Sequence, residues 1–313
     1  MPMTTQQALT FLQARLAKVD SEVIKPLKEY TWTRDLPVGN DLDRTVEALV
    51  LRRLETVAQG SQSMTGRSWI GRGANDLKGV NYSMSGSATR VFTGGREAAW
   101  TALDLERAQV NDGVRFDTEQ VDVINEVFQA EANAVGYFGD GQAGIPGLLN
   151  SDQITRVDGE GMLDVADASK VDLKKLVLYL NAQLQAAEHL SDDIVMPTTL
   201  LVSPAVYGKL FSLMLPDAAA TTVVDCLSRR SIAYAKNGSF KILPLRELAG
   251  AGKDGKDRAV LYTPDVRYLK YNVLPVWREK TYDKGLQYCA AYLWRIAEVQ
   301  FRHPETITYV DNL

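Results

Sequence analysis

Apolar side chains recur at three- and four-residue intervals in two stretches of the chain. Over residues 117–139 they stand at Val121, Ile124, Val127, Phe128, Val135 and Phe138. This spacing places them on one face of a helix, so the sequence predicts a helix of about six turns that ends at a glycine cluster. Over residues 172–189 the same spacing predicts a second helix from Leu173, Leu176, Leu180 and Leu184.

Shorter patterns predict the other elements. Residues 4–19 fit a short amphipathic helix, residues 20–40 an extended arm, residues 44–58 a strand or a helix, and residues 98–112 a further helical pattern. Strands, turns and one more helix are predicted at 151–166, 198–212, 238–248, 258–276 and 286–310, with an exposed loop at 249–258. Helices and strands are segregated along the chain, which indicates an α+β fold.

Residues 60–96 are rich in glycine and serine, with single aromatic side chains between short strand-like runs such as VNYSM and TRVF. Turn signals between these runs predict a long β-hairpin arm. An arm with so few core residues does not easily stabilise itself in solution. We therefore expect the arm to lie on another surface.

The glycine cluster at Gly139–Asn150 reads GDGQAGIPGLLN, and its first six residues have the G-x-G-x-x-G spacing of dinucleotide-binding enzymes. In those enzymes the motif follows a strand and opens a helix, so that the pyrophosphate meets the helix N-terminus. Here a predicted helix precedes the motif, and Pro146 and Gly147 prevent a new one. The glycines are therefore predicted to end the helix in a left-handed conformation and to form a sharp turn.

Candidate catalytic and metal-binding residues are few. The two histidines, His189 and His303, are far apart in the sequence and lack a partner motif. The Asp192–Asp193 pair and the SRRS stretch at Ser228–Ser231 are interpreted as solvated surface. The sequence matches none of the common catalytic, nucleotide-binding or metal-binding motifs. It therefore predicts no catalytic residue, no cofactor-binding residue and no metal ligand.

The composition is that of an ordinary globular protein. The chain has 313 residues, 45% of them hydrophobic and 24% charged, and its net charge of −4 argues against a dedicated nucleic-acid binder. Cys226 and Cys289 fit two reduced core thiols better than a disulfide. The N-terminus lacks the pattern of a signal peptide, and no apolar run reaches the ~18 residues that span a bilayer. We therefore expect a soluble protein folded in a cytoplasm.

The order of these parts resembles that of the major capsid proteins of tailed phages, which share the Hong Kong ninety-seven fold with encapsulins. The sharpest match is residues 98–150, where a helical pattern is followed by the long acidic helix and then by GIPGLLN. The resemblance covers about residues 35–313 and implies that residues 44–58 are a strand. It also implies five parts of the chain: an N-terminal arm (1–43), an extended loop (44–97), a peripheral domain with a spine helix (98–147), an axial domain (148–261) and strands that return to the peripheral domain (262–313).

The resemblance implies a non-enzymatic coat protein that self-assembles into an icosahedral shell enclosing the viral genome. Its implied partners are copies of itself in hexamers and pentamers, double-stranded DNA bound without sequence specificity, and separate scaffold, portal or decoration proteins. No cofactor and no membrane are implied, and the implied location is the virion capsid after synthesis in the host cytoplasm. An encapsulin-like shell around a cargo is the first alternative, and an enzyme with an unrecognised site is the second.

Three further expectations concern contacts between subunits. Residues 1–40 are expected to be ordered only by neighbouring subunits. Residues 61–100 carry a net charge of +3 and residues 101–149 carry −7, which fits either two solvated faces or two complementary contact surfaces. Because family members lay the extended loop over the next subunit, the candidate subunit-contact residues are Arg67, Arg72, Lys78 and Arg90. Some members join a loop lysine to an asparagine of a neighbour, for which Lys78 and Asn272 are conceivable, but no motif supports this pair and we expect no cross-link.

Overall fold

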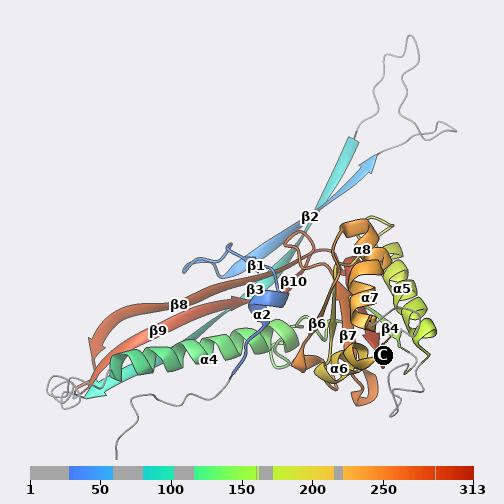
Figure 1. The fold of residues 1–313 in the computed structure, drawn as a ribbon. Helices are drawn as coiled ribbons and strands as arrows, with labels where there is room; N and C mark the ends of the chain where they lie inside the picture. The colour runs from blue at the N-terminus through green and yellow to red at the C-terminus, as the bar shows by residue number, and fades with distance from the viewer. Residues whose placement is uncertain are drawn as a thin grey trace, which may run out of the picture. The chain divides into compact units, whose positions relative to one another are not determined.

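The computed structural model describes residues 28–58, 80–101, 116–159, 161, 172–214, 221–285 and 287–313, except for the side chains of 54–58, 80–83 and 116–119. The helix predicted at 4–19 and the glycine-rich residues 59–79 lie outside the described residues. Residues Thr31–Leu313 form one compact unit. The described part of this unit is built around two sheets and the helices packed on them (Figure 1).

The first sheet has six strands in the order β1-β8-β9-β3-β2, with β10 paired to β8. Its strands are β1 (Val38–Gly39), β2 (Ala48–Ala58), β3 (Val80–Thr101), β8 (Leu269–Asp283), β9 (Gln287–Ala297) and β10 (Gln300–Phe301). Neighbouring strands are antiparallel except for β1 and β8. The apolar pattern of 44–58 left strand and helix open, and the structure has a strand there from Ala48 onward.

The long helix predicted from apolar spacing is α4 (Phe116–Phe138), which packs on β8, β9 and β3 (Figure 1). Ile124, Phe128 and Ala132 are buried. The ring of Phe128 meets that of Trp294 on β9 edge-on, with 6.2 Å between the centroids. The apolar face predicted from the sequence is therefore the face that packs on the sheet.

The second sheet has five strands in the order β4-β11-β7-β5-β6. These strands are β4 (Thr155–Asp158), β5 (Thr199–Val202), β6 (Lys241–Pro244), β7 (Arg258–Tyr262) and β11 (Thr308–Asp311). Four helices share a hydrophobic core with one face of this sheet: α5 (Leu173–His189), α6 (Pro204–Ser212), α7 (Val223–Arg230) and α8 (Ile232–Asn237). Short 3-10 helices stand at η2 (Arg246–Leu248), η3 (Lys253–Gly255) and η4 (Pro304–Thr306).

Local hydrogen bonds fix where the four helices begin. The side chains of Asp172, Ser203, Thr222 and Ser231 each accept a bond from a backbone N–H in the first turn of α5, α6, α7 and α8. The helix predicted at 172–189 and the strand and helix predicted at 198–212 are confirmed. The sequence did not predict α7 and α8, because helices of 8 and 6 residues are too short for their apolar spacing to stand out.

The glycine cluster ends α4 as the sequence predicts. Gly139 and Gly144 have φ values of +68° and +67°, a left-handed conformation that glycine adopts without steric cost. The Asn150 carboxamide accepts a bond from the Gly147 N–H and donates one to the Phe138 carbonyl, each at 2.7 Å. A helix precedes these glycines and the next element is the strand β4. The dinucleotide-binding interpretation is therefore excluded.

Arg258, at the junction of a predicted loop and a predicted strand, is the centre of a buried ion pair. Arg258 stands where the predicted loop 249–258 meets the predicted strand region 258–276; it begins β7, and only 5% of its surface is exposed. Its Nε and Nη2 donate to the two carboxylate oxygens of Asp311, at 2.5 and 2.8 Å. Its Nη1 donates to the Leu149 carbonyl, and its guanidinium lies over the Tyr309 ring. These contacts join the turn after α4 to β7 and β11.

The segment before β1 packs within its own chain. Its short helix α2 (Trp32–Asp35) interrupts the arm that was predicted to be extended, and Trp32, Asp35 and Leu36 are buried. The Trp32 indole N–H donates to Gln129 of α4 at 2.8 Å. The expectation that neighbouring subunits alone order residues 1–40 is therefore wrong for Thr31–Leu36, because these residues bury apolar surface against their own chain.

Asp35 makes the strongest contacts in this segment. Its carboxylate accepts a bond from the Tyr137 hydroxyl at 2.6 Å and two bonds from Arg34 at 2.6 and 2.9 Å. Its backbone carbonyl accepts a bond from the Tyr262 hydroxyl at 2.9 Å. Since Tyr137 lies on α4 and Tyr262 on β7, one buried residue connects α2 to both elements.

We expect Asp35→Ala to destabilise the subunit by about 2 kcal/mol, because it removes the charged acceptor of the buried Tyr137 hydroxyl, which keeps only its hydrogen bond with the Thr31 hydroxyl. Denaturant unfolding of unassembled subunits measures this change. Trypsin should also cleave after Arg34 faster in the variant, because α2 is no longer held to α4. Asp35→Asn keeps an acceptor for Tyr137 and should lie between the variant and the parent. Equal cleavage after Arg34 in all three proteins would contradict this role of Asp35.

The helical pattern predicted at 98–112 is wrong in its first residues. β3 continues through Thr101 and pairs with β9 along this stretch. Ala98 and Trp100 are buried while Ala99 between them is only half-buried, which is the alternation of a strand. Alanines and a tryptophan at such short range do not distinguish the two periods. Residues 102–115 lie outside the described residues.

Candidate interaction surface

β2 and the first half of β3 form a two-stranded arm. Ala48–Ala58 pairs in antiparallel register with Val80–Arg90. The runs VNYSM and TRVF, predicted as separate short strands with turn signals between them, are instead parts of the one continuous strand β3, whose partner in the arm is β2. Val50 and Met84 expose 61% and 57% of their surface on the arm. A two-stranded ribbon is marginally stable by itself. We therefore still expect the arm to lie on another surface.

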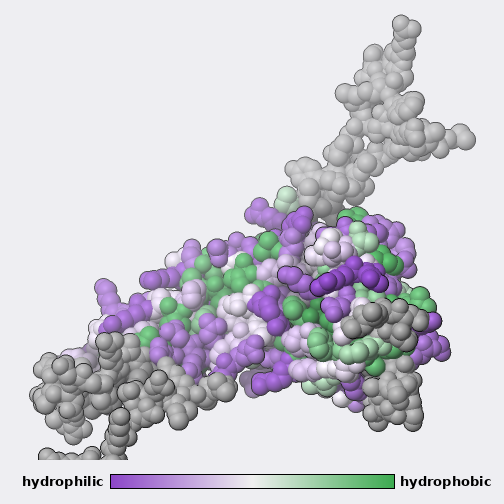
Figure 2. All heavy atoms as spheres, in the orientation of Figure 1, coloured by the Kyte–Doolittle hydropathy of each residue, from purple (hydrophilic) through white to green (hydrophobic). Residues whose placement is uncertain are grey.

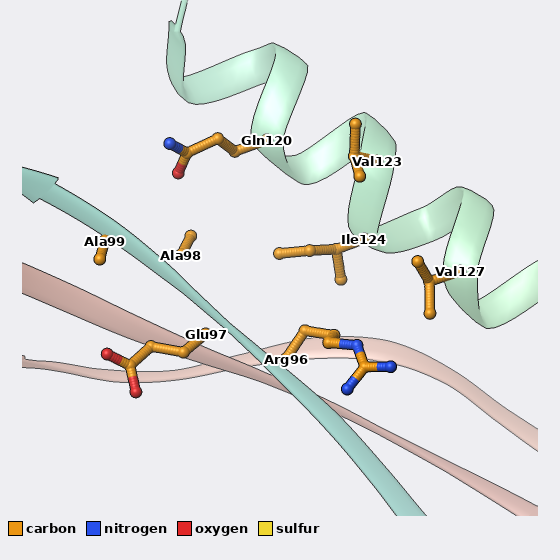
Figure 3. Close-up of a pocket in the computed structure, with 8 residues that line it drawn as sticks. All are labelled: Arg96, Glu97, Ala98, Ala99, Gln120, Val123, Ile124 and Val127. Atoms are coloured by element: carbon orange, nitrogen blue, oxygen red, sulfur yellow. The ribbon is translucent and has the colours of Figure 1, made fainter.

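A groove of about 490 Å³ lies between β3 and the first half of α4 (Figure 3). Its lining residues are Arg96, Glu97, Ala98, Ala99, Gln120, Val123, Ile124 and Val127. Ile124 points across the groove toward Ala98, whereas 59% of the Val123 surface is exposed. The groove therefore offers mainly apolar contacts next to a charged strand.

Arg96 bridges the groove to the middle of α4. Its Nη2 lies 3.8 Å from the Glu131 carboxylate, and both side chains are largely solvated. Glu131 also accepts a bond from the Trp294 indole N–H at 2.9 Å. Part of the basic and acidic segments seen in the sequence thus pairs within one chain. On the face shown in Figure 2, hydrophilic and hydrophobic residues are interspersed.

Glu97 points away from α4 (Figure 3) and holds a cluster of donors on the other face of the sheet. Its carboxylate accepts bonds from the Tyr282 hydroxyl at 2.8 Å and the Lys284 ammonium at 2.9 Å. The thiol of Cys289, followed by Lys284 and Tyr282, lowers the pKa of Glu97 from 4.5 to about 2. The cluster joins β3 to the ends of β8 and β9.

The lowered pKa of Glu97 predicts that this cluster survives moderate acid. A carboxyl group whose pKa is lower in the folded chain stabilises the fold above its unfolded pKa, and that stabilisation is lost as pH falls from 4.5 to about 2. The difference in stability between the parent and Glu97→Gln should shrink over this window. Lys284→Met should move the titration of Glu97 to higher pH, and an unchanged carboxyl titration by NMR would contradict the assignment.

Of the four predicted subunit-contact residues, the described part of the chain contains Arg90. Its Nη1 donates to the Ala143 carbonyl in the turn after α4, at 2.6 Å, and the residue stays exposed. Arg67, Arg72 and Lys78 lie outside the described residues. A contact between Arg90 and another copy therefore has to coexist with the Ala143 bond or replace it.

Asn272, the conceivable cross-linking partner, is buried with none of its surface exposed. Its Oδ1 accepts a bond from the Asp41 N–H at 3.4 Å. A carboxamide in this position is out of reach of a lysine from outside. The expected absence of a cross-link through Asn272 stays a prediction, now with a structural reason.

The remaining candidates from the sequence are the two histidines and the two cysteines. His189 pairs with Asp193 at 2.5 Å and His303 with Glu305 at 2.7 Å, and both histidines are more than half exposed. Cys226 and Cys289 are free thiols, as predicted, but of the two only Cys289 is buried in the core. Among the described residues, no cluster of three His, Cys, Asp or Glu side chains could hold a metal ion. No helix in these same ranges is both long and apolar enough to cross a membrane.

A two-stranded arm, a long helix on an antiparallel sheet and a second sheet with its own helices together form the architecture of a virus shell subunit. The family model described as major capsid protein matches residues 66–313, so the chain belongs to the major capsid protein family. It is a coat protein, and its fold is the Hong Kong ninety-seven type found in tailed-phage capsids.

Solved structures share this fold at low sequence identity. The capsid of the Myoviridae phage XM1 is 14% identical, with 96% of this chain and 98% of that chain covered and a TM-score of 0.72. The capsid of a native GTA particle is 13% identical, with 98% and 99% covered and a TM-score of 0.57. The chain from Mycobacterium phage Bobi is 15% identical, with 99% of each chain covered and a TM-score of 0.55. No curated protein sequence matches the chain.

Proposed function

We propose that copies of this protein assemble as hexamers and pentamers into a closed icosahedral shell that encloses double-stranded DNA in a tailed phage. The supporting observation is the combination of a capsid fold with a two-stranded arm that has few contacts of its own to stabilise it. Separate scaffold, portal or decoration proteins complete the particle, and synthesis takes place in the host cytoplasm. The protein acts by binding rather than by catalysis.

The proposal also divides the chain into functional parts. Residues 1–43 form the N-terminal arm, 44–97 the extended loop, 98–147 and 262–313 the peripheral domain, and 148–261 the axial domain. β3 crosses the boundary at 97 without interruption, so the loop and the peripheral domain share one strand. A movement of the arm would therefore be transmitted directly to the sheet that carries α4.

Electron microscopy of the purified chain, alone and together with the scaffold, portal or decoration proteins, tests the proposal. We expect closed particles of uniform size that protect double-stranded DNA from nuclease. Particles that contain a protein cargo and no DNA would favour the encapsulin-like alternative. A chain that remains a small oligomer under all these conditions would contradict shell assembly.

The charge asymmetry supports a second proposal, in which the basic arm of one subunit meets acidic residues of the next. Exposed pairs contribute only ~0–1 kcal/mol each, so several must act together to steer assembly. Reversing Arg67 and Arg72 together to Glu should slow assembly at low salt and leave subunit unfolding unchanged. Because the Debye length falls to ~3 Å at 1 M salt, the difference from the parent should vanish there. Equal assembly rates at low salt would leave two solvated faces as the explanation.

A further inference from the structure

A second cavity, of about 300 Å³, lies between the second half of α4, the strands β3 and β9, and the turn that follows α4. We call it the end pocket. It shares no lining residue with the groove along the first half of α4. Two carboxylates line it, those of Glu131 and Asp140. Its apolar walls include Phe92, Ala134, Val135, Ile145 and Ile296.

The Glu131 carboxylate is only partly satisfied by its own chain. One oxygen accepts a bond from the Trp294 indole N–H at 2.9 Å. The other lies 3.8 Å from the Arg96 guanidinium, which is longer than a charge-assisted hydrogen bond. A β-carbon on Gly94 would lie 2.3 Å from the indole nitrogen, so a glycine at this position lets Trp294 line the pocket beside Glu131.

The Asp140 carboxylate is held in place by the turn. Its Oδ1 accepts bonds from the backbone N–H groups of Gln142 and Ala143, at 2.9 and 3.4 Å. The nearby guanidinium of Arg90 donates to the Ala143 carbonyl. Among the described residues no ion pair includes Asp140, so its second oxygen is available to a cation from outside the chain.

The surroundings of the end pocket favour a cation. α4 contains five acidic residues and no lysine or arginine, so no basic side chain stands in its last turn. The negative end of the helix dipole therefore lies beside the pocket without a cation from the same helix. The Trp294 ring, which also lines the pocket, is the aromatic surface that attracts ammonium groups most strongly.

The spacing of the two carboxylates indicates an elongated ligand. Glu131, Ala134 and Val135 lie three and four positions apart, on one face of α4. Asp140 follows Glu131 by nine positions. At ~1.5 Å of rise per residue, the backbones that carry the two carboxylates are on the order of 10 Å apart. A ligand that contacts both needs a positive group at each end and an apolar chain between them.

We propose that the end pocket binds a linear alkyl diamine, with one ammonium group at Glu131, the other at Asp140, and the methylene groups along the apolar walls. The inference rests on the proposed enclosure of double-stranded DNA, because the dense charge of the duplex gathers cations around it. A bound diamine neutralises two carboxylates beside α4. It thereby lowers the repulsion between this acidic surface and the DNA phosphates.

Calorimetric titration of unassembled subunits tests the ligand class. We expect putrescine to bind one molecule per subunit, and n-butylamine, which has a single ammonium group, to bind about tenfold more weakly or less. Equal affinities for the two amines would overturn the inference, because a single ammonium group such as that of a lysine side chain would then suffice. Displacement of putrescine by Mg²⁺ at equal ionic strength would indicate diffuse counterion binding and would also overturn it.

Amide variants test the two carboxylates. Glu131→Gln keeps an acceptor for Trp294, and Asp140→Asn keeps one for the turn, so both subunits should unfold close to the parent. Each should bind putrescine about tenfold more weakly. Asp122→Asn removes the same charge from α4 outside the lining of the pocket and should bind like the parent. Unchanged affinity in both pocket variants, or an equal loss in Asp122→Asn, would contradict the site.

Two further measurements do not depend on the carboxylates. Ala134→Leu fills part of the apolar wall without a change of charge and should also weaken putrescine binding, so it decides the question if an amide variant fails to fold. In NMR spectra of the parent, saturating putrescine should shift the indole N–H signal of Trp294, which donates to Glu131. An unshifted signal at saturation would place the ligand elsewhere and overturn the inference.

The outcomes separate this inference from the proposed function, because every binding measurement uses unassembled subunits. Shells that form around DNA from a chain that does not bind putrescine would overturn the inference alone. A chain that binds putrescine in the end pocket but never forms shells would overturn the shell function and leave the binding site standing.

Discussion

Gly139→Ala and Gly147→Ala are each expected to prevent the subunit from folding. A β-carbon on Gly139 would lie 2.1 Å from the Ile145 carbonyl oxygen, and the φ of +68° at this position adds strain for any other residue. A β-carbon on Gly147 would lie 2.4 Å from the carbonyl carbon and oxygen of Tyr137. The atoms in the way are backbone atoms of the turn in the first case and of the end of α4 in the second, so no side-chain rotation relieves the overlap. Loss of soluble protein, with the chain in the insoluble fraction, is the expected readout.

The same turn contains its own controls. A β-carbon on Gly141 would meet nothing within 4 Å, so Gly141→Ala should leave the thermal unfolding of the subunit unchanged. Gly144 has equally open surroundings but a φ of +67°, so Gly144→Ala should cost about 1 kcal/mol from backbone strain alone. The series thus separates steric overlap from strain. If all four variants were equally soluble and stable, the tight turn after α4 would have to be rejected.

The sequence was informative about this turn because all of its determinants are local. The apolar spacing of 117–139 predicted α4, and the helix before the glycines was enough to reject a phosphate-binding loop. The helix α5 was predicted for the same reason. In each case the residues that form the element are close together in the chain, so their pattern carries the information.

Other features depend on partners that are distant in sequence. Nothing near Asp35 predicts that its carboxylate binds Tyr137, 102 positions away. The pairing of β3 with β2 stops at Arg90, and a single strand pattern does not reveal where its neighbour ends. The sequence therefore showed residues 60–96 only as a hairpin arm with few core residues.

The ion pair of Arg258 was missed for the same reason and provides the second large effect. Arg258 closes a run of glycine, lysine and aspartate, a composition that is typical of an exposed loop. Its partner Asp311 lies 53 positions away, near the end of the chain. Only the antiparallel pairing of β7 with β11 sets Arg258 directly opposite Asp311.

We expect Asp311→Ala to destabilise the subunit by about 3–5 kcal/mol, because it leaves the Arg258 guanidinium buried without its charged partner. The side chains of the pair are only 5% and 9% exposed, so water cannot replace the lost carboxylate. The double variant Arg258→Met with Asp311→Leu removes both charges and should be more stable than Asp311→Ala, although the Leu149 carbonyl loses its donor.

A matched control is the exposed pair of Arg156 and Asp152, whose side chains are 47% and 95% exposed. Here Asp152→Ala should change stability by ~0–1 kcal/mol. Denaturant unfolding of unassembled subunits measures all three variants, and a loss in Asp311→Ala no larger than in Asp152→Ala would mean that the buried pair does not hold the turn after α4 to the second sheet.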